Sequence, residues 1–141
     1  MVPPSLQRAV RIAVPSRFVA GTLVRAFGIE PKKISVVRHG LESAFDGETT
    51  SSDALRRQFD LGNGPVLVYP AITHPHKNHA FLLQLMASGE GRWADPALRL
   101  ICMGSQGSAH EEILQLIDTL GIGNRVVMAG RVSNADRNGL L

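Results

Sequence analysis

The residues best suited to chemistry lie in one stretch of ten, residues 70–79, with the sequence PAITHPHKNH. An apolar run, 66–69, precedes this stretch, and apolar residues at helical spacing follow it. The pattern predicts a loop that joins a buried strand to a helix. In a parallel sheet such a loop lies at the carboxyl end of its strand, where ligands bind, and a helix start attracts anions. Lys77 adds a positive charge there, so the loop is a candidate anion site.

Three histidines in the same loop, His74, His76 and His79, suggest a second chemistry, because closely spaced imidazoles can converge on a metal ion. No cysteine and no well-placed carboxylate accompanies them, so we expect no metal site. The only cysteine, Cys102, lies in an apolar run and predicts a buried strand thiol rather than a nucleophile. No catalytic triad, carboxylate pair or P-loop is evident.

A second candidate loop, Gly104-Ser105-Gln106-Gly107, follows the apolar run 98–103. Glycines there let backbone N–H groups approach a phosphate closely. The same pattern is equally typical of a tight turn, so both interpretations stay open. Lys77 on the neighbouring loop strengthens the case for a nucleotide diphosphate.

The composition excludes several classes of protein. The net charge of +3 comes from 15 basic and 12 acidic residues, and aromatic residues are only 5% of the chain, which disfavours a nucleic-acid partner. No apolar run approaches the roughly 20 residues of a membrane helix, and the N-terminus does not resemble a signal peptide. A soluble, cytoplasmic protein is therefore expected.

The hydrophobic pattern changes within residues 42–64, which predicts a boundary between two units. Residues 1–41 predict a strand, a helix that begins after Ser16, and a second strand. A linker and a short helix are expected in 42–64. Residues 65–141 alternate regularly, with strands expected at 66–70, 98–103 and 125–129, helices at about 77–88 and 109–120, a capping box at Ser108 and Glu111, and a further helix start at Ser133. The fold class is therefore α/β, built of parallel-sheet, Rossmann-like βαβ units.

Seven stretches of the chain form a recognisable series: IAVPSRF (12–18), FGI (27–29), KISVVRHG (33–40), YPA (69–71), PHKNH (75–79), LICMG (100–104) and RVVMAGRV (125–132). In their order and spacing they resemble glycosyltransferase family 4, which has the two-lobed GT-B fold, and within it a mannosyltransferase-like branch. The resemblance covers nearly the whole chain.

The resemblance implies retaining transfer of a sugar, such as mannose, from a GDP- or UDP-sugar to a glycan or lipid-linked acceptor, without metal or other cofactor. Lys77 and His76 would then face the donor phosphates, Gly104 would border the donor, and Arg131 and Val132 would lie near the nucleobase. Residues 1–41 would end the acceptor lobe, and 65–141 would begin the donor lobe. Peripheral association of the full-length enzyme with the inner face of the membrane is also implied.

The chain departs from the family in two places. Many members carry a Gly-Arg pair in the loop before the lysine, where this chain has Ala71 and Ile72, so His74 or His76 is the candidate replacement cation. The family's Glu-x7-Glu motif has no counterpart, which leaves the catalytic residues unassigned. We therefore expect an internal fragment that is inactive by itself. The alternative function is a non-enzymatic nucleotide-binding or interaction module with half of this fold.

Overall fold

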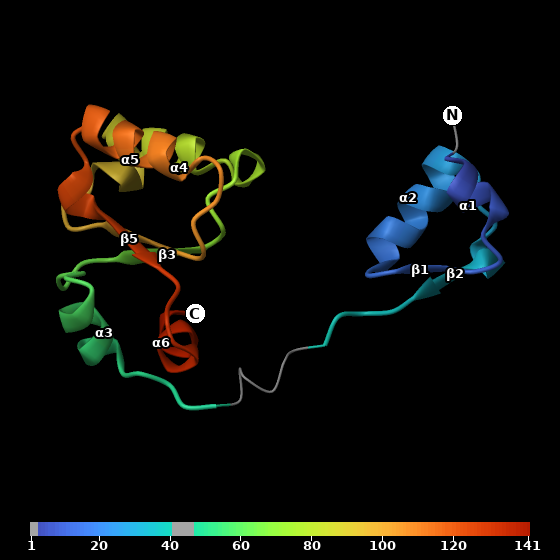
Figure 1. Cartoon of the computed structure of the whole chain (residues 1–141), viewed down its shortest axis with the longest axis horizontal. Helices are drawn as coiled ribbons and strands as arrows, with labels where there is room; N and C mark the ends of the chain where they lie inside the picture. Colours follow the sequence, from blue (N-terminus) through green and yellow to red (C-terminus); the bar gives the residue numbers. More distant parts are fainter. Residues whose placement is uncertain (1–2, 41–46) are drawn as a thin grey trace. The chain divides into compact units, whose positions relative to one another are not determined.

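The computed structural model describes residues 3–40 and 47–141. The chain divides into two compact units, Met1–Glu42 and Ser43–Leu141 (Figure 1). The short helix predicted within 42–64 belongs to the second unit.

The first unit is a pair of parallel strands covered by a helix. Val14 of the first strand lies opposite Val36 of the second. As predicted, Ser16 caps the helix, because its Oγ accepts a hydrogen bond from the Val19 N–H at 3.2 Å. Phe18 lies on the apolar face of this helix but is 77% exposed, since two strands are too narrow to cover the whole face. The elements are α1 (Pro4–Arg8), β1 (Ile12–Val14), α2 (Arg17–Phe27), the 3-10 turn η1 (Pro31–Lys33) and β2 (Ile34–Val36).

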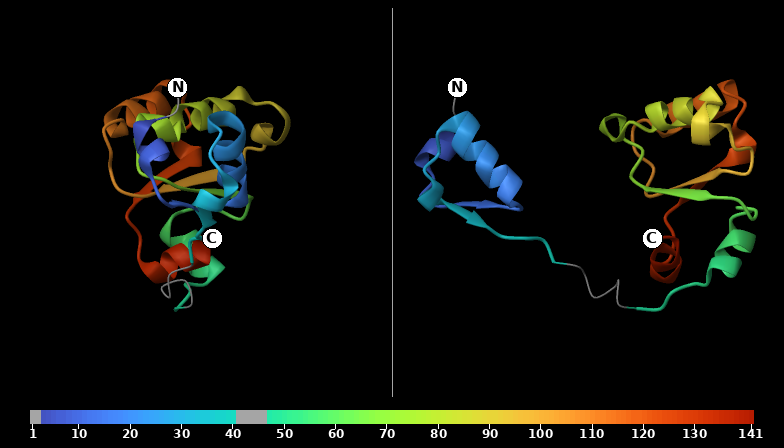
Figure 2. Two further views of the ribbon diagram at one scale, coloured as in Figure 1. Left: turned by 90° about the vertical axis from the view of Figure 1, so that its right-hand side faces the viewer. Right: turned by 180° about the vertical axis from the view of Figure 1, so that it is seen from behind.

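The second unit has three layers around a parallel sheet of strand order β3-β4-β5. Helices α4 and α5 connect successive strands and lie on one face of the sheet, while α3 and α6 lie on the other (Figures 1 and 2). The predicted parallel α/β fold of βαβ units is confirmed. The elements are α3 (Ser52–Gln58), β3 (Val66–Pro70), η3 (Pro75–Lys77), α4 (His79–Ser88), η4 (Gly91–Ala94), β4 (Arg99–Met103), α5 (His110–Thr119), η5 (Gly123–Arg125), β5 (Val126–Gly130) and α6 (Asn134–Leu140).

Two helix starts differ from the prediction. Helix α4 begins at His79 rather than at residue 77, because residues 75–77 form a 3-10 turn and Asn78 has a left-handed backbone with φ 54°. Helix α5 begins at His110 without a side-chain cap, so the predicted capping box at Ser108 is wrong. The cap predicted at Ser133 is confirmed, since its Oγ accepts from the Asp136 N–H at 3.0 Å.

The core of the second unit lies between the sheet and helices α4 and α5. Central strand β4 contributes most, since Leu100 and Ile101 are fully buried. Because both faces of β4 are covered, the strand is a continuous apolar run rather than an alternating one. The buried cluster consists of Leu83, Met86, Leu98, Leu100, Cys102, Ala109, Ile113, Ile117, Ile122 and Val126.

Arg125 binds backbone groups at the edge of this core where β5 begins, away from the carboxyl ends of the strands. Its Nη1 donates to the Met86 carbonyl at 3.0 Å, at the end of α4. Its Nη2 donates to the carbonyls of Trp93 at 2.8 Å and Asp95 at 3.1 Å. One guanidinium therefore satisfies a backbone acceptor near the end of α4 and two in the irregular segment between α4 and β4.

His79 is the one described histidine that is fully buried, with 2% of its surface exposed. Neither ring nitrogen has a hydrogen-bond partner among the described residues. Burial lowers the pKa of His79 below its usual 6.5, and the backbone of Ala71 opposes the shift only in part. The side chain is therefore neutral in the folded protein.

Replacing Arg125 with Met should destabilise the second unit by about 2–4 kcal/mol, because a charged group's hydrogen bonds are lost and buried carbonyls lose their donor. Urea unfolding followed by tryptophan fluorescence would measure this, since Trp93 lies beside the guanidinium. The matched control is Arg92→Met, which removes an exposed arginine from the same segment. Equal unfolding midpoints for the two variants would contradict the assigned role.

The buried His79 should make stability pH-dependent. Its pKa is lower in the folded than in the unfolded state, so its contribution is complete above the unfolded value of about 6.5 and is lost as the pH falls below it. Between pH 7.5 and 5.5, His79→Phe should lose less stability than wild type, while His76→Phe, at an exposed position, should follow wild type. Parallel pH profiles for all three proteins in urea unfolding would refute this.

Candidate functional site

A cavity of about 340 Å³ lies where the three strands of the second unit end. Its walls come from the segments that follow β3, β4 and β5, as expected for ligand sites in open parallel sheets. The lining residues are Pro70, Ala71 and Ile72 after β3, Met103, Gly104 and Ser105 around the end of β4, and Arg131, Val132, Asn134 and Arg137 after β5.

The charge of this cavity is positive. Arg131 and Arg137 both line it, and no acidic residue does so among the described parts of the chain. Arg131 is exposed, whereas Arg137 is partly buried and its Nη2 donates to Asn138 Oδ1 at 3.2 Å. A site with cations on one wall and backbone on the others suits an anionic ligand.

Thr73 joins the loop after β3 to the loop after β4. It is 4% exposed, and its Oγ1 accepts from the Gly107 N–H at 2.7 Å. Its backbone carbonyl accepts from the Ala109 N–H at 3.0 Å, and its own N–H donates to the Ser105 carbonyl at 3.3 Å. Three hydrogen bonds from one residue thus fix the relative position of two cavity walls.

The glycines of the second loop are required by this contact. A Cβ at Gly104 would lie 2.7 Å from the Ala71 carbonyl oxygen, and the residue has φ +146°. A Cβ at Gly107 would lie 2.7 Å from the Thr73 carbonyl oxygen. The Gly104 N–H donates to the Gly130 carbonyl at 2.7 Å, so Gly104 forms part of the cavity wall and does not offer its N–H to a ligand.

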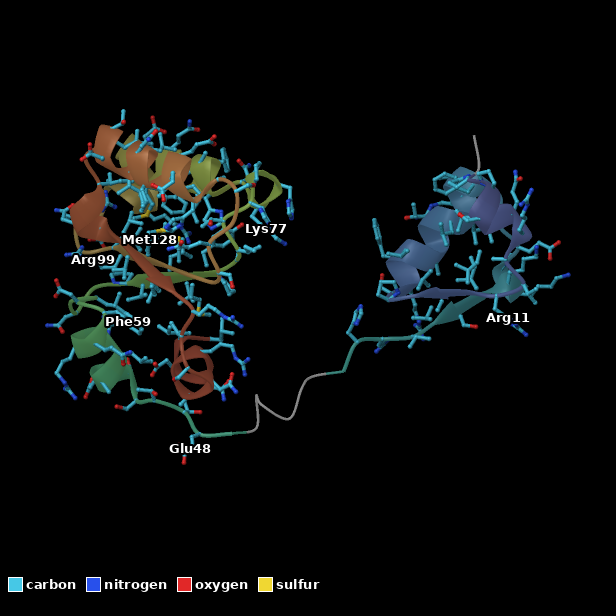
Figure 3. The ribbon with its side chains drawn as sticks, in the orientation of Figure 1. Arg11, Glu48, Phe59, Lys77, Arg99 and Met128 are labelled. Carbon is cyan, nitrogen blue, oxygen red and sulfur yellow. The ribbon has the colours of Figure 1, made fainter. Side chains whose placement is uncertain are left out.

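Lys77 and His76 lie on the η3 turn, outside the set of residues that lines the cavity. Both side chains are exposed, and Figure 3 shows Lys77 on the loop that follows β3. The backbone of Lys77 is held from both sides, because its N–H donates to the His74 carbonyl at 2.9 Å and its carbonyl accepts from the Tyr69 hydroxyl. The structure thus brings Gly104, Arg131 and Val132 together and leaves Lys77 and His76 on the adjoining turn.

Two of the loop histidines contact each other. His74 stacks on His76 with ring centroids 5.8 Å apart, and its Nδ1 lies 3.3 Å from the Ser108 backbone nitrogen. Within residues 3–40 and 47–141, no three His, Cys, Asp or Glu side chains are placed to hold a metal ion.

Cys102 fits the prediction of a buried strand thiol. It is 4% exposed, and burial raises its pKa to about 11. The thiolate is therefore scarce at neutral pH, which argues against a nucleophile.

Two further contacts of the site were not predicted from the sequence. Besides Thr73, Asp136 ties α6, which carries Arg137, to α3 and the segment before it, on the same face of the sheet. Its carboxylate accepts from Thr50 Oγ1 at 2.7 Å and from Gln58 Nε2 at 3.2 Å. These hydrogen bonds, the Thr50 one foremost, lower the pKa of Asp136. Partners this distant in sequence leave no local pattern, whereas Thr73 could have been suspected as a small polar residue directly after the apolar Ala71 and Ile72.

No protein-family model matches the chain, and no curated protein sequence matches it. Solved structures do. HepE of Anabaena, solved in complex with UDP-glucose, is 21% identical, with TM-score 0.69, over 92% of this chain and 35% of its own. A glycosyltransferase of Rickettsia africae is 20% identical, with TM-score 0.69, over 94% and 38%.

Sucrose-phosphate synthase of Thermosynechococcus elongatus is 19% identical, with TM-score 0.67, over 92% of this chain and 32% of its own. The chain thus spans about a third of the length of these structures. What the likeness shows is a fold shared with GT-B glycosyltransferases, in agreement with the Rossmann-like α/β class expected from the sequence.

Proposed function

We propose that this chain is the donor-binding part of a retaining glycosyltransferase of family 4, and that its cavity takes the nucleotide-sugar. The observation that carries the proposal is the cavity at three strand ends, which Arg131 and Arg137 line and to which no acidic residue of the described segments contributes. The fold shared with glycosyltransferases supports it, as does the UDP-glucose in the HepE structure.

The chemistry asked of this site is stabilisation of a leaving diphosphate. Negative charge grows on the diphosphate as the sugar departs, and a fixed cation facing it lowers the barrier. In this proposal Lys77 supplies that cation from the η3 turn. Arg131 lies at the wall formed after β5, where its backbone and Val132 adjoin the nucleobase while its side chain remains available to the phosphates, and Gly104 forms the wall beside the donor.

Arg131 is also the better replacement for the cation that Ala71 and Ile72 lack. It lines the same cavity as these two residues, whereas His74 and His76 stack on each other away from it. We therefore assign the second phosphate-binding charge to Arg131 rather than to a histidine.

The two candidate donors, a UDP-sugar and a GDP-sugar, are supported by different observations. UDP and UDP-glucose are the ligands of the HepE structures, so a uridine nucleotide is the first donor to test. A GDP-sugar, and mannose as the sugar, rest on the sequence resemblance alone. A glycan or lipid-linked acceptor and a cytoplasmic site at the inner membrane face are proposed on the same basis. None of the described helices is long and apolar enough to cross a membrane.

A nucleotide-binding module without transferase activity is the second candidate. One observation favours it: the described residues that line the cavity include no carboxylate that could act as a general acid or base. Both candidates require nucleotide binding at the cavity, but only the first requires that a longer protein transfer sugar.

Removal of either proposed phosphate ligand should weaken nucleotide binding. Titration calorimetry with UDP and GDP is expected to show saturable binding by wild type, and Lys77→Ala and Arg131→Ala should each weaken it by roughly 10- to 100-fold, the value of a hydrogen bond to a charged group. Arg92→Ala, which removes an exposed arginine of the same unit, should bind as wild type does. Absence of binding, or equal affinity in all four proteins, would refute the donor site.

Nucleotide affinity should not depend on divalent cations, because arginine and lysine supply the charge that a metal ion would otherwise provide. The titration with UDP would be repeated in EDTA and in excess Mg²⁺. A tenfold or larger loss of affinity in EDTA would show that the cations of the chain do not suffice.

A further inference from the structure

The turn that carries Lys77 is held by a single side chain of strand β3. Tyr69 lies opposite Cys102 in the sheet, and its ring packs against the apolar core. Its hydroxyl reaches beyond the strand and donates to the backbone carbonyl of Lys77. A rigid ring anchored in the core thus fixes the position of an otherwise exposed turn.

The same tyrosine also contacts the residue on the other side of the turn. The rings of Tyr69 and His79 meet edge to face, with centroids 4.9 Å apart and planes at 73°. Asn78 lies between Lys77 and His79 with φ 54° and ψ 41°. Tyr69 therefore contacts both neighbours of this left-handed residue: its hydroxyl binds Lys77, and its ring packs against His79.

Hydrogen bonding explains little of the burial of His79, because neither nitrogen has a partner with hydrogen-bond geometry among the described residues and the backbone of Ala71 acts on the ring only weakly. Unpartnered buried polar groups are uncommon and call for a reason. As the first residue of α4, the ring anchors the helix start, which has no side-chain cap. Packing against Tyr69 thus fixes a helix start that no side-chain hydrogen bond caps.

We propose that Tyr69 and His79 are positioning residues that hold the Lys77 turn ready for the donor diphosphate. The inference rests on the proposed function, since it concerns the residue assigned to the phosphates. A turn fixed before binding loses less conformational entropy when the ligand arrives, so the pair raises affinity without touching the ligand. Pro75, which restricts the first position of the turn, contributes in the same sense.

Protonation of His79 should release this arrangement. The groups around it offer no counter-ion within hydrogen-bond distance: Tyr69 comes from β3, His74 from the preceding loop and the exposed Glu112 from α5. The positive end of α4 adds to the penalty on an imidazolium. Nucleotide affinity should therefore fall as the pH drops through the lowered pKa of His79, for a reason separate from the phosphates.

The test is a double-mutant cycle on UDP affinity at pH 7.5. Tyr69→Phe keeps the ring and removes the hydroxyl, and it should weaken binding by about three- to tenfold in the wild-type background. In the Lys77→Ala background the same change should have no effect, because nothing is left to position. Ser88→Ala, which removes an exposed hydroxyl at the far end of α4, should be neutral in both.

Backbone dynamics provide a second measurement. The heteronuclear NOE of the Lys77 and Asn78 amides should fall in Tyr69→Phe while the unfolding midpoint changes little. A pH titration of UDP affinity completes the set: from pH 7.5 to 5.5, His79→Phe should lose less affinity than wild type.

The outcomes separate the two proposals. If wild type does not bind UDP or GDP, the proposed function fails, and the inference fails with it. If wild type binds and Lys77→Ala weakens binding, but Tyr69→Phe binds as wild type does, only the inference is wrong. Equal losses from Tyr69→Phe in both backgrounds would likewise overturn it, since they would indicate a structural effect unrelated to Lys77.

Discussion

The site depends above all on the contact between two loops at the carboxyl ends of β3 and β4. Thr73 provides it, with a buried hydroxyl and two backbone groups that bond to the second loop. Such a residue cannot be replaced by an apolar one without leaving a buried N–H unsatisfied. The close approach it enforces is also what requires glycine at residues 104 and 107. The shape of the cavity is therefore set by the backbone, and side chains from the third strand end supply its charge.

This division of roles explains why the positive groups lie on different segments. Arg131 and Arg137 lie after β5, on the wall opposite the rigid loop pair. Lys77 lies one turn beyond the part of the first loop that lines the cavity. A diphosphate bound between Lys77 and these arginines would be contacted from two sides. The backbone on each side is fixed by different residues: Asp136 and its partners on the α3 side fix α6, and Tyr69 fixes the turn that carries Lys77.

The fold was largely predictable from the sequence because its signals are local. Strands β3, β4 and β5 are apolar runs bounded by turn residues, and Ser16 and Ser133 cap helices as their position predicts. The predictions that fail depend on groups far away in the sequence, or on how much of a helix face the sheet can cover. Ser108 does not cap α5, because its backbone and hydroxyl lie against His74. Phe18 is exposed because covering its helix face takes more than two strands. The positions of Gly104, Arg131 and Val132 at one cavity followed from parallel topology, but the roles of Thr73 and Asp136 depend on partners far away in sequence.

The start of α4 illustrates how a local irregularity acquires a role. A helix that began at Lys77 would place this lysine in a regular first turn, where the helix dipole disfavours a cation. The left-handed Asn78 instead separates Lys77 from the helix, so that the ammonium belongs to the preceding turn and the first helical residue is an imidazole. That imidazole is buried and neutral, so it adds no competing charge beside the lysine. Among the described residues the nitrogens of His79 have no hydrogen-bond partner, so the start of α4 is held by the packing of this ring against Tyr69.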